Sequence, residues 1–271
     1  MTDLPKYLIL EKAVGETPLA CLEKYRAEHP ELSRIPLAYA GRLDPMASGK
    51  LLVLVGEECK KQTEYHGLDK EYEFSILFGI DSDTQDVLGR LTTCTIPENI
   101  TTEKIELAAN RLLGLVALPY PHFSSKTVAG KPLHTWALEN RLHEIEIPTN
   151  KSTIYELELL RTETKPRTEA ATEARKKIDT IPPVTDLRKA IGNDFRRADV
   201  RQDWKNIKDD YSLPDTYLIA HFRCTASAGT YMRSLAKTIA EKLGTCGLAW
   251  HIHRTKIGRF NTKTQSWESE F

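Results

Sequence analysis

The chain has 271 residues, of which 40% are hydrophobic and 28% are charged, and its formal net charge at pH 7 is zero. These are ordinary values for a globular protein, so they exclude a largely disordered or fibrous chain. The sequence contains no run of about eighteen apolar residues that could span a membrane. The N-terminus carries acidic residues early and does not resemble a secretion signal.

Two segments in the first half have helical features. Residues 17–29 form the first, and residues 101–113 form the second, in which Ile105, Ala109 and Leu112 recur at helical spacing. Thr101 or Thr102 can cap the start of the second helix, and Gly114 can end it.

Four segments have the pattern of strands. Leu51–Val55 is a short buried run, and Ile154–Leu160 and Tyr217–Cys224 are predicted as two further strands. Glu71–Gly79 alternates in polarity, which predicts a strand with one buried side. The residues expected on that side are Tyr72, Phe74, Ile76 and Phe78.

A third helix is expected over about Thr230–Leu243, where Leu235, Ile239 and Leu243 form one row and Gly244 follows as a stop. Strands often follow strands along the chain. This mixed order favours an α+β fold over a parallel α/β fold.

The stretch Thr162–Pro214 differs from the rest of the chain because Thr, Glu, Arg, Lys and Asp dominate it. Its latter half, about Asp186–Lys208, is predicted to form an amphipathic helix. The apolar residues of that helix would be Leu187, Ile191, Phe195 and Trp204. We interpret the stretch as a polar surface insertion within a single domain that spans residues 1–271.

The five cysteines are scattered, at positions 21, 59, 94, 224 and 246, with no Cys-x-x-Cys pair. An odd number without close pairs favours reduced thiols in a cytosolic protein. We therefore expect a cytoplasmic protein with neither a disulfide framework nor a zinc site.

Residues 38–56 form the densest candidate motif. Two glycines and the Asp44-Pro45 step lead into a buried strand, and Pro45 restricts the backbone of Asp44 and so fixes where its side chain points. Such a turn could hold a carboxylate rigidly at a sheet edge, although Asp-Pro is also a common turn opener. Gly49-Lys50 does not complete a phosphate-binding loop, because the glycine spacing is wrong and Leu51 replaces the magnesium-binding Ser or Thr.

Other polar motifs carry weaker signals. The acidic run at residues 81–86 lacks the glycine of a calcium loop and is better interpreted as a polar, capped loop. His251 and His253 have no third ligand nearby, so a metal site is disfavoured.

Positive charge is concentrated near the C-terminus. Between His221 and Lys263 there are eight Lys or Arg residues and one acidic residue, Glu241. This local excess either holds phosphates or forms a solvated basic face. Gly229 opens the C-terminal helix, and Arg233 in its first turn could orient Asp44 if the two elements meet.

Taken together, these segments resemble the TruB family of tRNA pseudouridine synthases. The similar segments, in chain order, are LEKAVG (10–15), the catalytic loop at 38–49, Lys70–Tyr72, FGIDSDTQDVLG (78–89), 119–137, IYEL (154–157), SAGTYMR (227–233) and HRTKIGRF (253–260). The resemblance covers roughly residues 8–160 and 217–260. It implies a mixed, mainly antiparallel pseudouridine synthase sheet with flanking helices.

The resemblance implies roles for eleven residues. Asp44 would be the catalytic aspartate, Tyr72 would stack on the target base and assist proton removal from C5, and Arg233 would pair with Asp44. The substrate-binding residues would be Lys12, Tyr39, Gly41, Arg42, Leu43, Lys126, Tyr231 and Arg254. A carboxylate is ionised at neutral pH and can attack without a separate activating base, so no metal or organic cofactor is required.

The chain departs from the family pattern at several positions. Tyr39 stands in place of a histidine, Ala13 in place of a proline, Phe123 in place of a tyrosine, and Thr127 in place of a lysine, with Lys126 beside it. Only eleven residues follow Phe260, too few for the C-terminal RNA-binding PUA domain of many relatives. We therefore expect a form without a PUA domain, and we hypothesise that the insertion at Thr162–Pro214 contributes part of the RNA binding. Its deletion would then weaken tRNA binding more than turnover.

The sequence thus predicts a cytoplasmic isomerase that converts the T-loop uridine of tRNA, position 55, to pseudouridine. Its partner would be the T-arm of tRNA, and we expect a monomer with no membrane association and no obligate protein partner. Three alternatives remain. The chain could be an RNA-binding or RNA-folding protein without catalysis, a synthase for another RNA, or a generic aspartate-dependent hydrolase.

Overall fold

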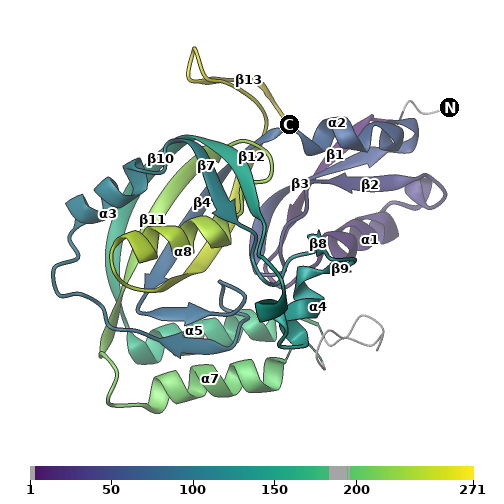
Figure 1. Ribbon diagram of the computed structural model, residues 1–271. Coiled ribbons are helices and arrows are strands. Elements are labelled where there is room, and N and C mark those ends of the chain that lie inside the picture. The colour runs from purple at the N-terminus through teal and green to yellow at the C-terminus, as the bar shows by residue number, and fades with distance from the viewer. Residues whose placement is uncertain (1–3, 183–193, 195) are drawn as a thin grey trace.

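The computed structural model describes residues 4–182, 194 and 196–271, and its centre is one mixed sheet of nine strands among those residues (Figure 1). The strands are β1 (Tyr7–Lys12), β2 (Leu37–Ala40), β3 (Ala47–Val55), β4 (Asp69–Phe78), β7 (Gly114–Pro119), β10 (Thr149–Pro166), β11 (Thr216–Ala226), β12 (Gly247–Asn261) and β13 (Ser266–Glu270). Their order is β1-β3-β12-β4-β11-β10-β7, with β2 beside β3 and β13 beside β12. Only the β3–β12 pair is parallel among these described strands. The predicted α+β class is confirmed.

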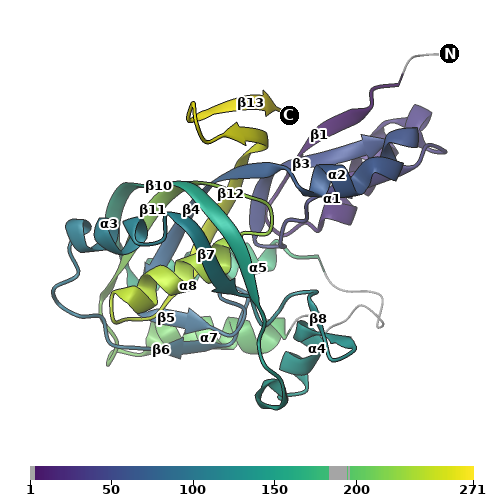
Figure 2. The same ribbon diagram turned by 45° about the horizontal axis from the view of Figure 1, so that its top comes forward.

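Helices cover both faces of this sheet (Figures 1 and 2). α3 (Thr102–Asn110) and α8 (Met232–Lys242) pack on one face, and α5 (Arg167–Asp179) and α7 (Arg197–Asp209) pack on the other. Shorter elements complete the described chain: α1 (Pro18–Glu28), α2 (Gln62–His66) and α4 (Leu133–Leu138), the ribbons β5 (Ile80–Ser82) with β6 (Leu91–Thr93) and β8 (Thr127–Val128) with β9 (Lys131–Pro132), and 3-10 turns at Pro30–Leu32, Gly56–Lys61 and Leu142–Glu144.

The three predicted helices are confirmed as α1, α3 and α8, and the caps of the first two follow from sequence. The hydroxyl of Thr17 accepts a hydrogen bond from the backbone N–H of Ala20, and the hydroxyl of Thr101 accepts one from that of Lys104. Each cap satisfies a backbone donor that the first helical turn leaves free.

The four predicted strands are also found, within β3, β4, β10 and β11, but the prediction of one buried side for β4 is wrong. Phe74, Ile76 and Phe78 face the core beneath α8, whereas Leu77 is equally buried in the core beneath α5 and α7. β4 lies in the middle of the sheet between β12 and β11, so helices cover both of its faces.

The stretch Thr162–Pro214 is structured differently from the predicted surface insertion. Its first residues extend β10 to Pro166, and it then forms α5, which the sequence analysis missed. The predicted amphipathic helix is present from Arg197 as α7, with Trp204 fully buried, while Leu187, Ile191 and Phe195 lie outside the described residues. Both helices therefore contribute to the hydrophobic core.

The expectation of five reduced cysteines is wrong, because Cys94 and Cys246 form a disulfide. They are 152 residues apart in the sequence, and their Cα atoms lie 6.0 Å apart. Gly79 brings them together: its carbonyl accepts a hydrogen bond from the Cys94 N–H, and its N–H donates to the Cys246 carbonyl. Spacing along the chain could not reveal a pair that the fold assembles.

No helix in the part of the chain that the structure describes is both long enough and apolar enough to cross a membrane.

Candidate active site

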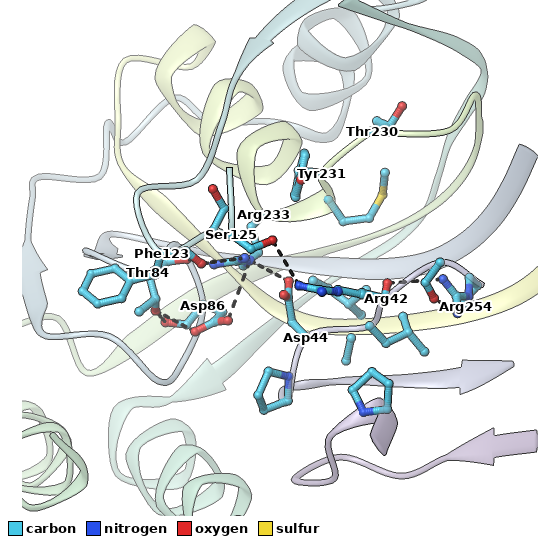
Figure 3. A pocket seen from close by; sticks show the side chains of 18 of the residues that line it. Arg42, Asp44, Thr84, Asp86, Phe123, Ser125, Thr230, Tyr231, Arg233 and Arg254 are labelled. Carbon is cyan, nitrogen blue, oxygen red and sulfur yellow. Dashed lines mark hydrogen bonds and ion pairs between the residues drawn. The ribbon is translucent and has the colours of Figure 1, made fainter. Parts of the chain in front are cut away.

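A pocket of about 1120 Å³ lies where the β2–β3 turn, β4, the β5–β6 loop and the start of α8 meet (Figure 3). Nine of the eleven residues predicted for the site line it: Tyr39, Gly41, Arg42, Leu43, Asp44, Tyr72, Tyr231, Arg233 and Arg254. They come from four separate parts of the chain, so the fold assembles the site from the segments that the sequence analysis singled out.

Asp44 lies in the turn between β2 and β3, and this turn has fixed anchors. Its backbone reverses at Gly41, which has a φ of +81°, and enters β3 through Gly49, at +106°. A side chain at Gly49 would collide with Arg254, because a Cβ atom there would lie 2.3 Å from the Arg254 carbonyl oxygen. Glycine is therefore required at position 49 by conformation and by space.

Arg254 holds this turn from β12. Its side chain is almost fully buried, and it donates hydrogen bonds to the carbonyls of Lys50 (2.7 Å) and Gly41 (3.1 Å) and contacts that of Arg42 (3.5 Å). These carbonyls flank Asp44 on both sides, so the buried guanidinium fixes both ends of the turn that carries Asp44.

Arg233 lies against Asp44 at the floor of the pocket (Figure 3). Its Nε atom is 2.8 Å from Oδ2 of Asp44 and 4.0 Å from Oδ2 of Asp86. Its Nη1 donates to the carbonyl of Thr84 at 2.7 Å, and its Nη2 to that of Phe123 at 3.4 Å. Four groups on three segments of chain thus position one guanidinium.

The two carboxylates beside Arg233 differ in their access to the pocket. The side chain of Asp44 is 39% exposed, and that of Asp86 is 7% exposed. Burial raises the pKa of Asp86, against the opposing influence of Arg233 and the hydrogen bond from Thr84. Burial also acts to lower the pKa of Arg233, but Asp44 and Asp86 outweigh it and raise that pKa. Asp44 is therefore the carboxylate that a substrate can reach. Asp86 contacts Arg233 from the buried side of the guanidinium.

Three tyrosines from three elements supply aromatic walls. Tyr72 on β4 packs against the core beneath α8, and Tyr39 lies on β2. Tyr231 precedes α8, and its ring meets that of Tyr120 edge to face at 5.4 Å. Aromatic faces stack on bases whatever their sequence.

Two predicted substrate-binding residues lie outside the pocket lining. Lys12 is fully buried, and its Nζ donates to the carbonyls of Ala13 and Glu16, both at 2.8 Å. Burial lowers its pKa to about 8. It stabilises the turn whose Gly15 N–H donates to the Pro45 carbonyl, next to Asp44. Lys126 is exposed, with its Nζ 5.2 Å from the centre of the Tyr120 ring.

Several residues that line the pocket were not among the eleven predicted site residues, although Phe123 was noted as a departure from the family pattern. They are Lys70, Thr84, Asp86, Phe123, Ser125, His134 and Arg196. Lys70 belongs to the Lys-x-Tyr segment that the resemblance used, yet it received no role. Its Nζ donates to backbone carbonyls of Leu68 and His66, and burial together with Arg254 lowers its pKa to about 8. Asp86 lies in the acidic run that was interpreted as a capped loop. That run of acidic residues was the feature of the sequence that could have identified Asp86 as a site residue.

Metal ligands are not grouped in the described residues: no cluster of three or more His, Cys, Asp or Glu side chains could hold an ion there. His251 and His253 stack with their ring centres 6.3 Å apart on β12.

Comparisons with known proteins show the family of this chain. A family model described as TruB family pseudouridylate synthase (N terminal domain) matches residues 32–180. The tRNA pseudouridine synthase B of Caldicellulosiruptor saccharolyticus is 30% identical over 258 residues, which cover 94% of this chain and 68% of that protein. The tRNA pseudouridine synthase 4 of Saccharomyces cerevisiae is 26% identical over 239 residues, 79% of this chain and 58% of that protein.

A solved structure shares the fold. A chain in the crystal structure of a Cbf5-Nop10-Gar1 complex superposes with a TM-score of 0.54 and 16% sequence identity, over 93% of this chain and 48% of that chain. At this identity the likeness concerns the architecture alone.

Proposed function

The chain belongs to the TruB family of pseudouridylate synthases, and we propose that it converts the T-loop uridine of tRNA, position 55 in the usual count, to pseudouridine. The observation that carries this proposal is the contact of 2.8 Å between the reachable carboxylate Asp44 and the buried guanidinium Arg233 at the floor of an aromatic pocket. Pseudouridine is an isomer of uridine, so the enzyme is an isomerase that needs no co-reactant.

In the proposed reaction, the bond between N1 of the base and C1′ of the ribose breaks, the base turns, and a bond from C5 to C1′ replaces it. Asp44 is the nucleophile, and the bond that its carboxylate forms to the nucleotide breaks again when C5 bonds to C1′, which regenerates the free carboxylate. Arg233 keeps the Asp44 carboxylate oriented, because a guanidinium with three further partners cannot turn away. Tyr72 stacks on the base and assists removal of the C5 proton, while N1 gains a proton, so the atoms balance.

The base must leave its stack to reach Asp44, which costs a few kcal/mol. The tyrosine walls and the buried Leu43 offset this cost by contact with the base. Arg42 is exposed beside the turn, where its Nη1 lies 3.2 Å from the Ser125 hydroxyl, and it is placed to meet the phosphate backbone.

We propose that the protein acts on the tRNA T-arm as a monomer, as one catalytic domain and without an obligate protein partner. A mass near 30.7 kDa in solution supports the monomer, and a multiple of it contradicts it. We place this activity in the cytoplasm. The Cys94–Cys246 bond is the observation against that location, because disulfides are rare there.

The test maps pseudouridine to the nucleotide in unmodified tRNA transcript, comparing wild type with Asp44→Asn. Asparagine keeps the shape and one oxygen for Arg233 but is not a nucleophile, so the rate should fall by about four orders of magnitude or more. Asp209→Asn, at an exposed aspartate that ends α7, is the matched control and should behave as wild type.

Each outcome of this test supports or rejects a specific part of the proposal. Modification at the T-loop uridine by wild type and by the control alone supports the reaction, the target and the nucleophile. Modification of another uridine or another RNA rejects the target. Tight tRNA binding by wild type with no pseudouridine anywhere rejects catalysis and favours an RNA-folding protein.

A further inference from the structure

The β5–β6 loop determines where Arg233 lies. Its Thr84 carbonyl and Asp86 carboxylate face the guanidinium, and Gln85 in the same loop binds β12 through its carbonyl, which accepts the Ala249 N–H at 2.9 Å. This inner side of the loop belongs to the pocket. The outer side of the loop faces away from Arg233.

The outer side is held by α7. Asp203 accepts hydrogen bonds from the Arg90 guanidinium at 2.6 and 3.2 Å and from the backbone N–H of Leu91 at 3.1 Å. The indole N–H of Trp204 donates to the Val87 carbonyl at 2.9 Å. α7 therefore fixes the loop at its middle and at its end.

Arg196, immediately before α7, fixes the beginning of the loop. Its guanidinium forms a two-pronged contact with Asp83, at 2.6 and 3.1 Å. The same guanidinium lies 4.5 Å from the centre of the Phe123 ring, and the Phe123 carbonyl is another acceptor for Arg233. Arg196 thus joins α7 to both backbone segments that receive hydrogen bonds from Arg233.

α7 can serve as a support because its own position is fixed. Val200 and Trp204 are completely buried between α7 and the sheet, and the Trp204 ring packs edge to face on Trp250 of β12 at 6.0 Å. A helix anchored in a close-packed core transmits its position to whatever it binds.

We propose that α7 is a positioning element for the active site: through Arg196, Asp203 and Trp204 it holds the β5–β6 loop in the geometry that orients Arg233 toward Asp44. This inference rests on the proposed catalytic roles of Asp44 and Arg233. It gives the segment between β10 and β11 a role in turnover, whereas the hypothesis drawn from sequence gave it a role in gripping RNA.

The test uses two substitutions. Asp203→Asn removes the charge that holds Arg90. Trp204→Phe removes the N–H that binds Val87 and keeps an aromatic ring in the core, and the melting temperature reports the cavity that the smaller ring leaves. Asp179→Asn is the matched control, because it breaks a 2.7 Å ion pair between Arg201 of α7 and α5 without contacting the loop.

For each variant we would measure the single-turnover rate with tRNA fully bound, the tRNA Kd and the melting temperature. A displacement of reacting groups by a fraction of an ångström should lower the rate by about tenfold, with a Kd within about twofold of wild type. Asp203→Glu, which restores the charge, should recover part of the rate. Rates equal to wild type in both variants, or weakened Kd with an unchanged rate, would overturn the inference.

A second measurement separates this inference from the proposed function. The NMR signal of the Arg233 Nε–H, assigned with Arg233→Lys, reports the position of the guanidinium without any reaction. It should shift in Asp203→Asn and Trp204→Phe but not in the Asp179→Asn control. An unshifted signal rejects the inference, and a wild type that makes no pseudouridine rejects the proposed function alone.

Discussion

Replacing Arg254 by lysine should slow the reaction and destabilise the fold even though the charge is kept. The buried guanidinium binds the carbonyls of Lys50 and Gly41 simultaneously, on opposite sides of Asp44, and a third carbonyl lies at 3.5 Å. A lysine at this position has a single ammonium nitrogen, which cannot reach both sides of the turn. At least one buried carbonyl is then left without a donor.

The expected loss of stability follows from the one buried carbonyl that is left without a donor. A buried acceptor without a partner costs about 1–3 kcal/mol, and we take about 2 kcal/mol. For a domain of this size each kcal/mol lowers the melting temperature by roughly 2–4 °C, so the expected drop is roughly 4–8 °C. Because the released turn carries Asp44, the single-turnover rate should also fall by about 10- to 100-fold.

The assay compares Arg254→Lys with Arg259→Lys, at an exposed arginine on the same strand, by melting temperature, tRNA Kd and single-turnover rate. Unchanged melting temperature and rate would refute the positioning role. A weakened Kd with an unchanged rate would instead support the substrate contact that the sequence analysis predicted for Arg254.

Two further predictions concern the cysteines and the pH dependence. Denatured but unreduced protein should expose three thiols, from Cys21, Cys59 and Cys224, and reduction should raise the number to five; five thiols before reduction would contradict the Cys94–Cys246 bond. Lys70 lines the pocket with its pKa lowered to about 8 by burial and by Arg254, so it loses its positive charge as pH rises through that value. The affinity for tRNA should therefore weaken between about pH 7 and about pH 9 in wild type but not in Lys70→Met, and a wild-type affinity that is independent of pH would contradict this.

The turn that carries Asp44 was predictable because its signals are local. Gly41, Gly49 and the Asp44-Pro45 step occur within nine residues, and each acts through its own backbone. From the residues alone, the contact between Asp44 and Arg233 was predicted only on the condition that α8 meets the turn, and the family resemblance alone implied the pairing. The structure brings the two side chains to 2.8 Å.

Asp86 shows why part of the site could not be predicted. Its local sequence is typical of a polar loop, and two of its hydrogen bonds, from the Thr84 hydroxyl and the Leu88 N–H, are those of such a loop. Its contact in the pocket is with Arg233, far away in the chain, and no pattern in the loop encodes that partner.

α5 was missed because it buries small residues. Ala170, Ala171 and Ala174 are fully buried where α5 meets the core, whereas the exposed positions are mainly charged or polar. Alanine contributes little to hydrophobic periodicity, so the segment has the composition of a solvated face. A flat, alanine-lined surface nevertheless packs closely, and Ile178 completes it.

The excess of basic residues near the C-terminus shows that a count of charges along the sequence also misses partners that only the fold brings together. Arg233 and Arg254 are buried in the site, Arg223 pairs with Glu73 and Glu158, and Lys237 and Lys256 pair with Asp81 and Glu71. The partners come from β4, β5 and β10, so acids distant in sequence neutralise most of the local excess. A surface that attracts RNA must therefore be assembled from several segments, and counting charges along one of them overestimates its contribution.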